Sequence, residues 1–104
     1  QPSDRVPLHQ PSLSVGFSGG GALLTAEARG ALRSLSRGEV YVVIGHADHD
    51  ERNAELVSRQ RANTVAAQLK RQGFKVAAVK SFGHRRALTP ASAGANRRVD
   101  IVIR

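Results

Sequence analysis

The fold is decided by one stretch, which reads Val40-Tyr41-Val42-Val43-Ile44 and continues into Gly45-His46-Ala47-Asp48. Its five apolar residues are too few for a helix, and four of them are β-branched. They predict a central strand that is covered on both faces. Ligand sites in α/β sheets collect where strands end, so the polar residues after Ile44 are the first candidates for function.

A long amphipathic helix is expected after this strand, from about residue 53 to residue 72. Its apolar residues recur at helical spacing and lie on one arc: Val57, Ala62, Val65, Ala66 and Leu69. Polar residues such as Arg59 lie opposite, and Lys70, Arg71 and Gly73 are typical of a helix end. This helix therefore packs one face on the sheet.

Two elements are expected before the central strand. Leu13, Val15 and Phe17 alternate with small polar residues, which predicts a half-buried strand. A helix follows, capped by Thr25. Its periodicity, together with a basic last turn at Arg37 and a glycine at position 38, predicts that it ends there.

Two further strands complete the pattern. Residues 74–82 predict a third strand, with Val76 and Ala78 on one side and Ala77 and Val79 on the other. A basic loop of small residues is expected at residues 83–95, and alternation from Val99 onward predicts a fourth strand. The order β-α-β-α-β-β predicts an α/β (α+β) two-layer sandwich, with a mixed sheet and both helices packed on one face.

Length and composition fit a single domain. The chain has 104 residues, and we expect a flexible, proline-rich arm at residues 1–12 and one domain over residues 13–104. There is no cysteine, which excludes disulfides and thiolate zinc sites. No run approaches the roughly 18 apolar residues of a membrane-spanning helix. Because the chain starts at Gln1, we interpret it as trimmed or processed, with any membrane attachment through segments outside it.

The net charge of +8 suggests an anionic partner. Nucleic acid could be bound through Arg85, Arg86, Arg97 and Arg98, but these residues are distributed over several elements. Only one tyrosine and three phenylalanines are present, with no tryptophan, so the stacking residues that bind single strands are few. We therefore expect no nucleic-acid partner.

Asp48 and Arg61 are the main candidates for a binding site. Arg61 falls between Val57 and Val65, on the margin of the apolar arc, where a charge must snorkel, pair or bind something. Its helix starts just after the loop that carries Asp48. A carboxylate and a guanidinium held near each other could grip a zwitterion, with Asp48 on its ammonium group and Arg61 on its carboxylate. The alternative is an arginine that only snorkels.

The remaining polar motifs suggest no catalysis. His46, Asp48, His49 and Asp50 could in principle bind a metal, but no rigid ligand spacing supports this, and Asp50 could equally cap the next helix. Of the adjacent Arg97 and Arg98, one is expected to face inward. Neither a G-x-S-x-G motif nor a phosphate-binding loop is present. We expect a non-enzymatic protein without a cofactor or a metal.

Four motifs together resemble the OmpA-like domain, a peptidoglycan-binding module also found in Pal-type lipoproteins and the MotB flagellar stator. They are Ile44-Gly45-His46-Ala47-Asp48, a helix with Ser58, Arg61, Ala62, Val65, Leu69 and Gly73, then Phe82-Gly83, and finally Asn96-Arg97-Arg98-Val99-Asp100-Ile101. The resemblance implies a periplasmic, non-catalytic domain that anchors an envelope protein or complex to the cell wall. It also implies that Asp48 and Arg61 hold the diaminopimelate of the stem peptide. We expect the ligand-binding residues to be Asp48, Arg61, Arg97, Ala47 and Val57.

The chain departs from the family pattern at several positions. Ala47 replaces a threonine, Val57 replaces a leucine, and the loop after Asp48 is shorter. The first strand leads into Ser18-Gly19-Gly20 where acidic residues are usual. These losses motivate a second hypothesis, a degenerate domain that assembles a secretion, pilus or conjugation complex without binding peptidoglycan. In either case we expect a periplasmic location, attachment to the outer or inner membrane through an N-terminal region outside this chain, and other envelope proteins as further partners.

Overall fold

The computed structural model describes residues 12–17, 21–48, 51–83 and 97–104. Its elements are β1 (Leu13–Gly16), α1 (Ala26–Leu32), β2 (Val40–Gly45), α2 (Ala54–Arg71), β3 (Lys75–Ser81) and β4 (Arg98–Ile103). The order is the predicted β-α-β-α-β-β. Neither helix of the described part combines the length and the apolar character needed to cross a membrane.

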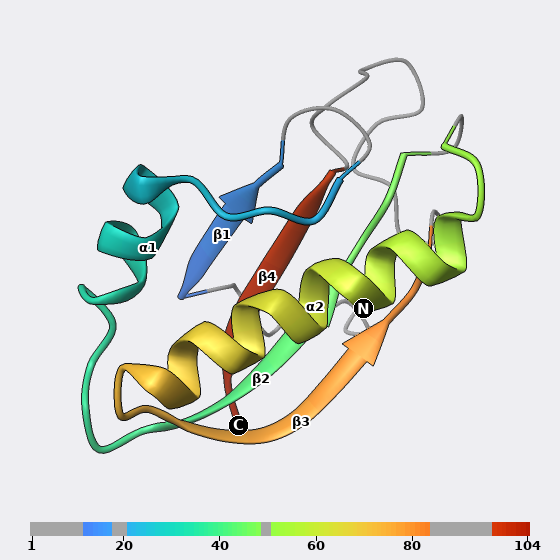
Figure 1. Cartoon of the computed structure of the whole chain (residues 1–104). Coiled ribbons are helices and arrows are strands. Elements are labelled where there is room, and N and C mark those ends of the chain that lie inside the picture. The colour runs from blue at the N-terminus through green and yellow to red at the C-terminus, as the bar shows by residue number, and fades with distance from the viewer. Residues whose placement is uncertain (1–11, 18–20, 49–50, 84–96) are drawn as a thin grey trace, which may run out of the picture.

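The strands form one mixed sheet with the order β1-β4-β2-β3. β2 and β3 are parallel, whereas β4 runs antiparallel to both β1 and β2. Both helices lie on the same face of this sheet, with α2 packed against β3, β2 and β4 and with α1 beside β1 (Figure 1). The predicted two-layer α+β sandwich is confirmed.

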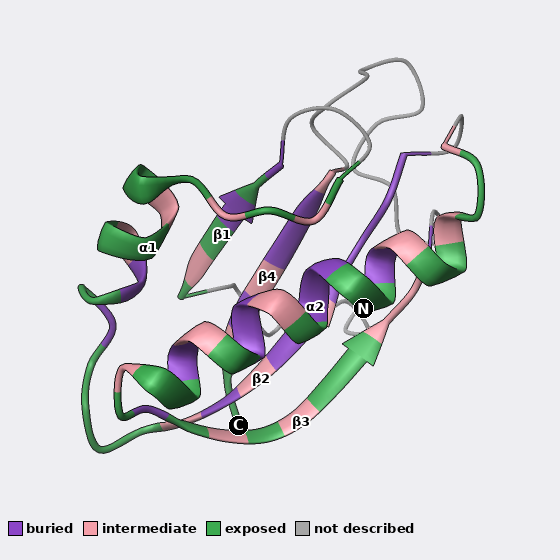
Figure 2. Cartoon of the chain, in the orientation of Figure 1, coloured by how far each residue is buried: buried purple, intermediate pink, exposed green. Residues whose placement is uncertain are grey.

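The core lies between the helices and the sheet (Figure 2). One face of each inner strand and one face of α2 supply it, and the buried apolar residues of these elements are Tyr41, Val43, Val99, Ile101, Ala62, Val65, Ala66 and Leu69. The strand β2 is central, as predicted, but only one of its faces is fully buried. Val40, Val42 and Ile44 keep partial exposure because the helices cover the other face.

The first helix is shorter than predicted. Thr25 caps it, as expected, and its hydroxyl accepts a hydrogen bond from the Ala28 N–H at 3.0 Å. The helix ends at Leu32 rather than near Arg37, and the next residues form i→i+3 bonds such as Ser34 N–H to Ala31 O. Arg37 instead donates to the carbonyl of Gln72 and covers the ring of Phe74, so tertiary contacts decide its position.

The second helix agrees with its predicted bounds to within one residue at each end. Its N-cap is Asn53, in the left-handed conformation (φ 54°), rather than Asp50, which lies outside the described residues. At the far end, Gly73 adopts φ 93°, in keeping with its predicted role as a helix terminator.

A register shift interrupts the pairing of β2 with β3. Tyr41 pairs with Val76, but Val42 pairs with Ala78, so β3 carries one extra residue at this point. Val43 consequently pairs with Val79. Burial in β3 nevertheless follows the predicted alternation, because Val76 and Ala78 are partly buried whereas Ala77 and Val79 are exposed.

Candidate functional site

The end of β2 is held against α2 and against the segment after β3. A Cβ built on Gly45 would overlap with the backbone carbonyl of Ser58, which shows how closely the strand approaches the helix. Gly83 bridges the two elements, because its N–H donates to Ser58 Oγ at 3.0 Å and its carbonyl accepts from the Ala47 N–H at 2.7 Å. This junction fixes the backbone from which Asp48 projects.

Arg61 is fully buried (0% exposed) on the face of α2 that meets the sheet. Its Nε donates to the carbonyl of Gly21 at 2.9 Å and its Nη1 to the carbonyl of His46 at 3.2 Å. Its guanidinium carbon lies 5.5 Å from the centre of the Phe17 ring. Of the expected alternatives, Arg61 does not snorkel; it is paired inside the protein.

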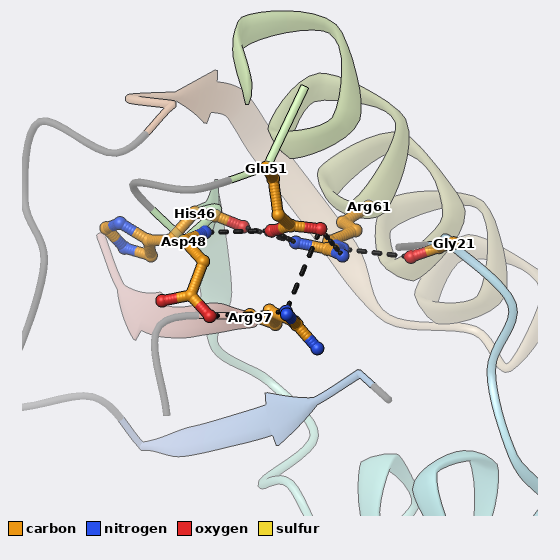
Figure 3. Close-up of polar contacts among 6 residues, drawn as sticks. All are labelled: Gly21, His46, Asp48, Glu51, Arg61 and Arg97. Atoms are coloured by element: carbon orange, nitrogen blue, oxygen red, sulfur yellow. Dashed lines mark hydrogen bonds and ion pairs between the residues drawn. The ribbon is translucent and has the colours of Figure 1, made fainter. Parts of the chain in front are cut away.

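The carboxylate that pairs with Arg61 belongs to Glu51 (Figure 3). Nη1 donates to Oε1 at 2.8 Å and Nη2 to Oε2 at 2.7 Å, which is the two-pronged geometry that arginine makes with carboxylates. The Glu51 side chain is only 6% exposed. Glu51 is also joined to Asp48, whose N–H donates to Oε1 at 2.8 Å and whose carbonyl accepts from the Glu51 N–H at 3.2 Å.

Sequence reasoning did not assign a role to Glu51. A signal was present, because a glutamate three residues after another polar residue can accept that residue's backbone N–H, as in a capping box. Asp48 and Glu51 have this spacing and this contact.

Asp48 is fully buried, and its carboxylate faces Arg97 rather than Arg61. Arg97 Nε lies 3.2 Å from Asp48 Oδ2 and 3.9 Å from Glu51 Oε2, and the Arg97 side chain keeps 23% of its exposure. The structure therefore brings together three of the expected site residues, Asp48, Arg61 and Arg97, with Glu51 between them (Figure 3). This acid–base cluster holds two carboxylates and two guanidiniums.

The electrostatics of the cluster keep Glu51 ionised. Burial alone would raise the pKa of Glu51, but the hydrogen bonds from Arg61 and from the Asp48 N–H lower it below its ordinary value, with help from the charges of Arg61 and Arg97. A carboxylate in this position is thus bound as an anion.

The other two expected site residues, Ala47 and Val57, are apolar. Ala47 is fully buried and Val57 is partly buried in the first turn of α2. Their contact with a ligand stays a prediction.

Arg97 and Arg98 lie beside different carboxylates. One of the two was expected to face inward and the other outward, but both side chains are largely buried. Arg98 Nε lies 3.2 Å from Asp100 Oδ1, and Asp100 also accepts from Ser14 Oγ at 2.7 Å. His46 Nε2 lies 3.2 Å from Asp100 Oδ2, and its ring stacks on Phe82. Burial would raise the pKa of Asp100, but the close contact with His46, the hydrogen bond from Ser14 and the charge of Arg98 lower it.

His46 thus pairs with Asp100 and does not join Asp48 in a metal site. Within residues 12–17, 21–48, 51–83 and 97–104, no group of three acidic, histidine or cysteine side chains could hold a metal ion. The candidate ligands His49 and Asp50 lie outside these residues, as do Arg85 and Arg86 of the nucleic-acid alternative.

Known proteins resemble this chain both in sequence and in fold. A model of the OmpA family matches residues 17–100. The peptidoglycan-associated lipoprotein from Burkholderia pseudomallei is 21% identical with a TM-score of 0.71, covering 88% of this chain and 89% of that one. The OmpA-like domain of FopA1 from Francisella tularensis is 23% identical with a TM-score of 0.70, covering 86% and 69%. The C-terminal domain of Helicobacter pylori MotB is 17% identical with a TM-score of 0.69, covering 85% and 81%. No curated protein matches the sequence significantly.

Proposed function

Because the chain belongs to the OmpA family, we propose that it is a non-catalytic domain that binds peptidoglycan and anchors an envelope protein or complex to the cell wall. One structural neighbour is itself named a peptidoglycan-associated lipoprotein. The observation that carries the proposal is the acid–base cluster of Asp48, Glu51, Arg61 and Arg97 at the end of β2. A periplasmic location follows from this function.

The ligand that we propose is the diaminopimelate of the stem peptide. Its free end carries an ammonium group and a carboxylate on one carbon, so it needs an acid and a base close together. Asp48 is the acceptor for the ammonium group, and the guanidiniums of Arg61 and Arg97 are donors for the carboxylate. Since the cluster is balanced in charge, a zwitterion adds no net charge to a buried site.

The overall charge of +8 supports the same function at longer range. Helix ends and the acid–base cluster account for part of it, and the remaining basic surface favours approach to an anionic wall polymer. This attraction is screened by salt, whereas contacts inside the buried cluster are screened much less. Binding in high salt therefore isolates the contribution of the cluster.

A sedimentation assay with purified sacculi tests the proposal. We expect the wild-type domain to be retained in high salt, and we expect Asp48→Ala, Arg61→Ala and Arg97→Gln to reduce retention strongly. Arg59→Gln is the matched control for loss of one positive charge, because Arg59 is exposed on α2. Circular dichroism checks folding, and Arg97→Gln carries the test if the more buried variants unfold.

The chemistry of the stem peptide provides a second control. Sacculi whose stem peptides carry lysine keep the ammonium group but lack the adjacent carboxylate. We expect the domain to prefer the diaminopimelate type, and free diaminopimelate should release it. Equal retention of the wild type and all three site variants would overturn the proposed site, and no retention of the wild type would overturn the function.

A further inference from the structure

We propose that Glu51 is an internal competitor for the ligand at Arg61, so that wall binding requires the exchange of one carboxylate for another. The inference rests on the proposed function and concerns the same site. It starts from the observation that the guanidinium of Arg61 already holds a carboxylate, at 2.8 and 2.7 Å, in the geometry that a bound ligand would adopt.

Arg61 would keep its position if Glu51 left. Its Nε and Nη1 are fixed by the carbonyls of Gly21 and His46, which lie on two different segments of the chain. The Asp48 N–H, which donates to Glu51 Oε1 at 2.8 Å, would be left pointing at the same place. The vacated position thus offers a carboxylate the same donors that Glu51 now uses.

Arg97 offers an alternative partner for the Glu51 carboxylate. Its Oε2 lies 3.9 Å from Arg97 Nε, and the Arg97 side chain is the more exposed cation of the cluster. Rotation of the Glu51 side chain toward Arg97 would keep its negative charge paired. The Nη1 and Nη2 groups of Arg61 would then be released for a ligand carboxylate. The exchange therefore replaces one ion pair by another and leaves no unpaired charge buried inside the protein.

The competition has a measurable consequence. A tethered carboxylate acts at a high effective concentration, and a ligand's apparent affinity falls with the fraction of the site that is open. Removing the carboxylate of Glu51 should therefore lower the dissociation constant for a zwitterionic ligand by about tenfold or more. The gain depends on Arg61, since Arg61 is the group that is released.

Calorimetric titration with free diaminopimelate tests this inference on the wild type, Glu51→Ala, Glu51→Gln and Glu51→Ala/Arg61→Met. We expect tighter binding by both single variants and loss of that gain in the double variant. Glu39→Gln, at an exposed acid remote in sequence from the site, is the control for a change in net charge and should leave the affinity unchanged. Circular dichroism of each variant checks its folding.

The outcomes separate the two proposals. If the wild type binds and the Glu51 variants bind equally or more weakly, Glu51 supports the site and the competition is wrong, while the function stands. If neither the wild type nor the folded variants bind diaminopimelate or sacculi, the function itself fails. If the variants do not fold, the carboxyl ¹³C resonance of Glu51 in the wild type decides: it should shift when diaminopimelate saturates the site, and binding without a shift overturns the competition.

Discussion

Gly45, at the end of β2, lies directly against the backbone carbonyl of Ser58 on α2. A Cβ at Gly45 would overlap with that carbonyl and would lie 3.0 Å from the Cβ of Ala62. Only glycine allows this approach. It is the approach that brings Arg61 within hydrogen-bonding distance of the carbonyl of His46, the residue after Gly45.

Gly45→Ala should therefore destabilise the domain by about 1–3 kcal/mol or more, because the obstacle is backbone and cannot turn away. Urea unfolding measures the loss. Gly16→Ala is the matched control, since Gly16 also lies in a strand and a Cβ there meets no atom within 4 Å. Equal stabilities of the two variants would show that the contact between β2 and α2 is not a constraint.

The ion pair between Glu51 and Arg61 should appear as a coupling energy in a double-mutant cycle. Arg61→Met leaves the buried Glu51 carboxylate without its main partner and should cost about 3–5 kcal/mol. Glu51→Leu has the converse effect on Arg61. The double variant should be more stable than the sum of the single losses predicts, by about 1–3 kcal/mol. Strict additivity in urea unfolding would contradict the pairing.

Acid should unfold the domain in part through Glu51 and Asp100. The pKa of each carboxyl is lowered in the folded protein, so their stabilising contribution is fully present above their unfolded pKa values, which are about 4. It is lost as the pH falls through the lower folded values. We expect the unfolding free energy to decline below about pH 4.5, and to decline less steeply in Glu51→Gln. Parallel curves for the variant and the wild type would refute the assignment to Glu51.

Ser58 should stabilise the junction beside the site through its hydroxyl. Its Oγ accepts from the Gly83 N–H and donates to the carbonyl of Glu55, and the side chain is fully buried. Ser58→Ala leaves the buried N–H of Gly83 without this acceptor, at a cost of about 1–3 kcal/mol. Thermal or urea unfolding against Ser34→Ala, whose hydroxyl bond is exposed, provides the comparison. A loss no larger than that of the exposed variant would argue against the role.

Most of the fold could be predicted because periodicity reports which face of an element is buried. The β-branched run at residues 40–44 and the helical arc from Val57 to Leu69 led to the observed β2 and α2. The end of α1 and the register shift in β3 could not be found in this way. Both depend on tertiary contacts, such as those of Arg37 with Gln72 and Phe74, which local propensity does not encode.

The sequence predicted that Asp48, Arg61 and Arg97 lie close together, but it predicted neither the part of Glu51 nor which acid pairs with which base. The end of β2, one face of α2 and the start of β4 meet at the site. They bring together Asp48, Arg61 and Arg97. Which acid meets which base depends on the position of Glu51, which lies shortly before α2. The sequence around Glu51 has no periodic pattern that would predict its contact with Arg61.

The position of β4 in the sheet has a consequence for how the domain folds. β4 is inserted between β1 and β2, so among the described strands β1 pairs with β4 alone, and Ser14 bonds to Asp100 across 86 positions of sequence. Contacts between residues so far apart in sequence form late, because the chain must first lose the entropy of closing a long loop. Arg97 directly precedes β4 and arrives with it. The charged cluster is therefore complete only when β4 has joined the sheet, and a nascent or partly unfolded domain lacks Arg97 at the proposed binding site.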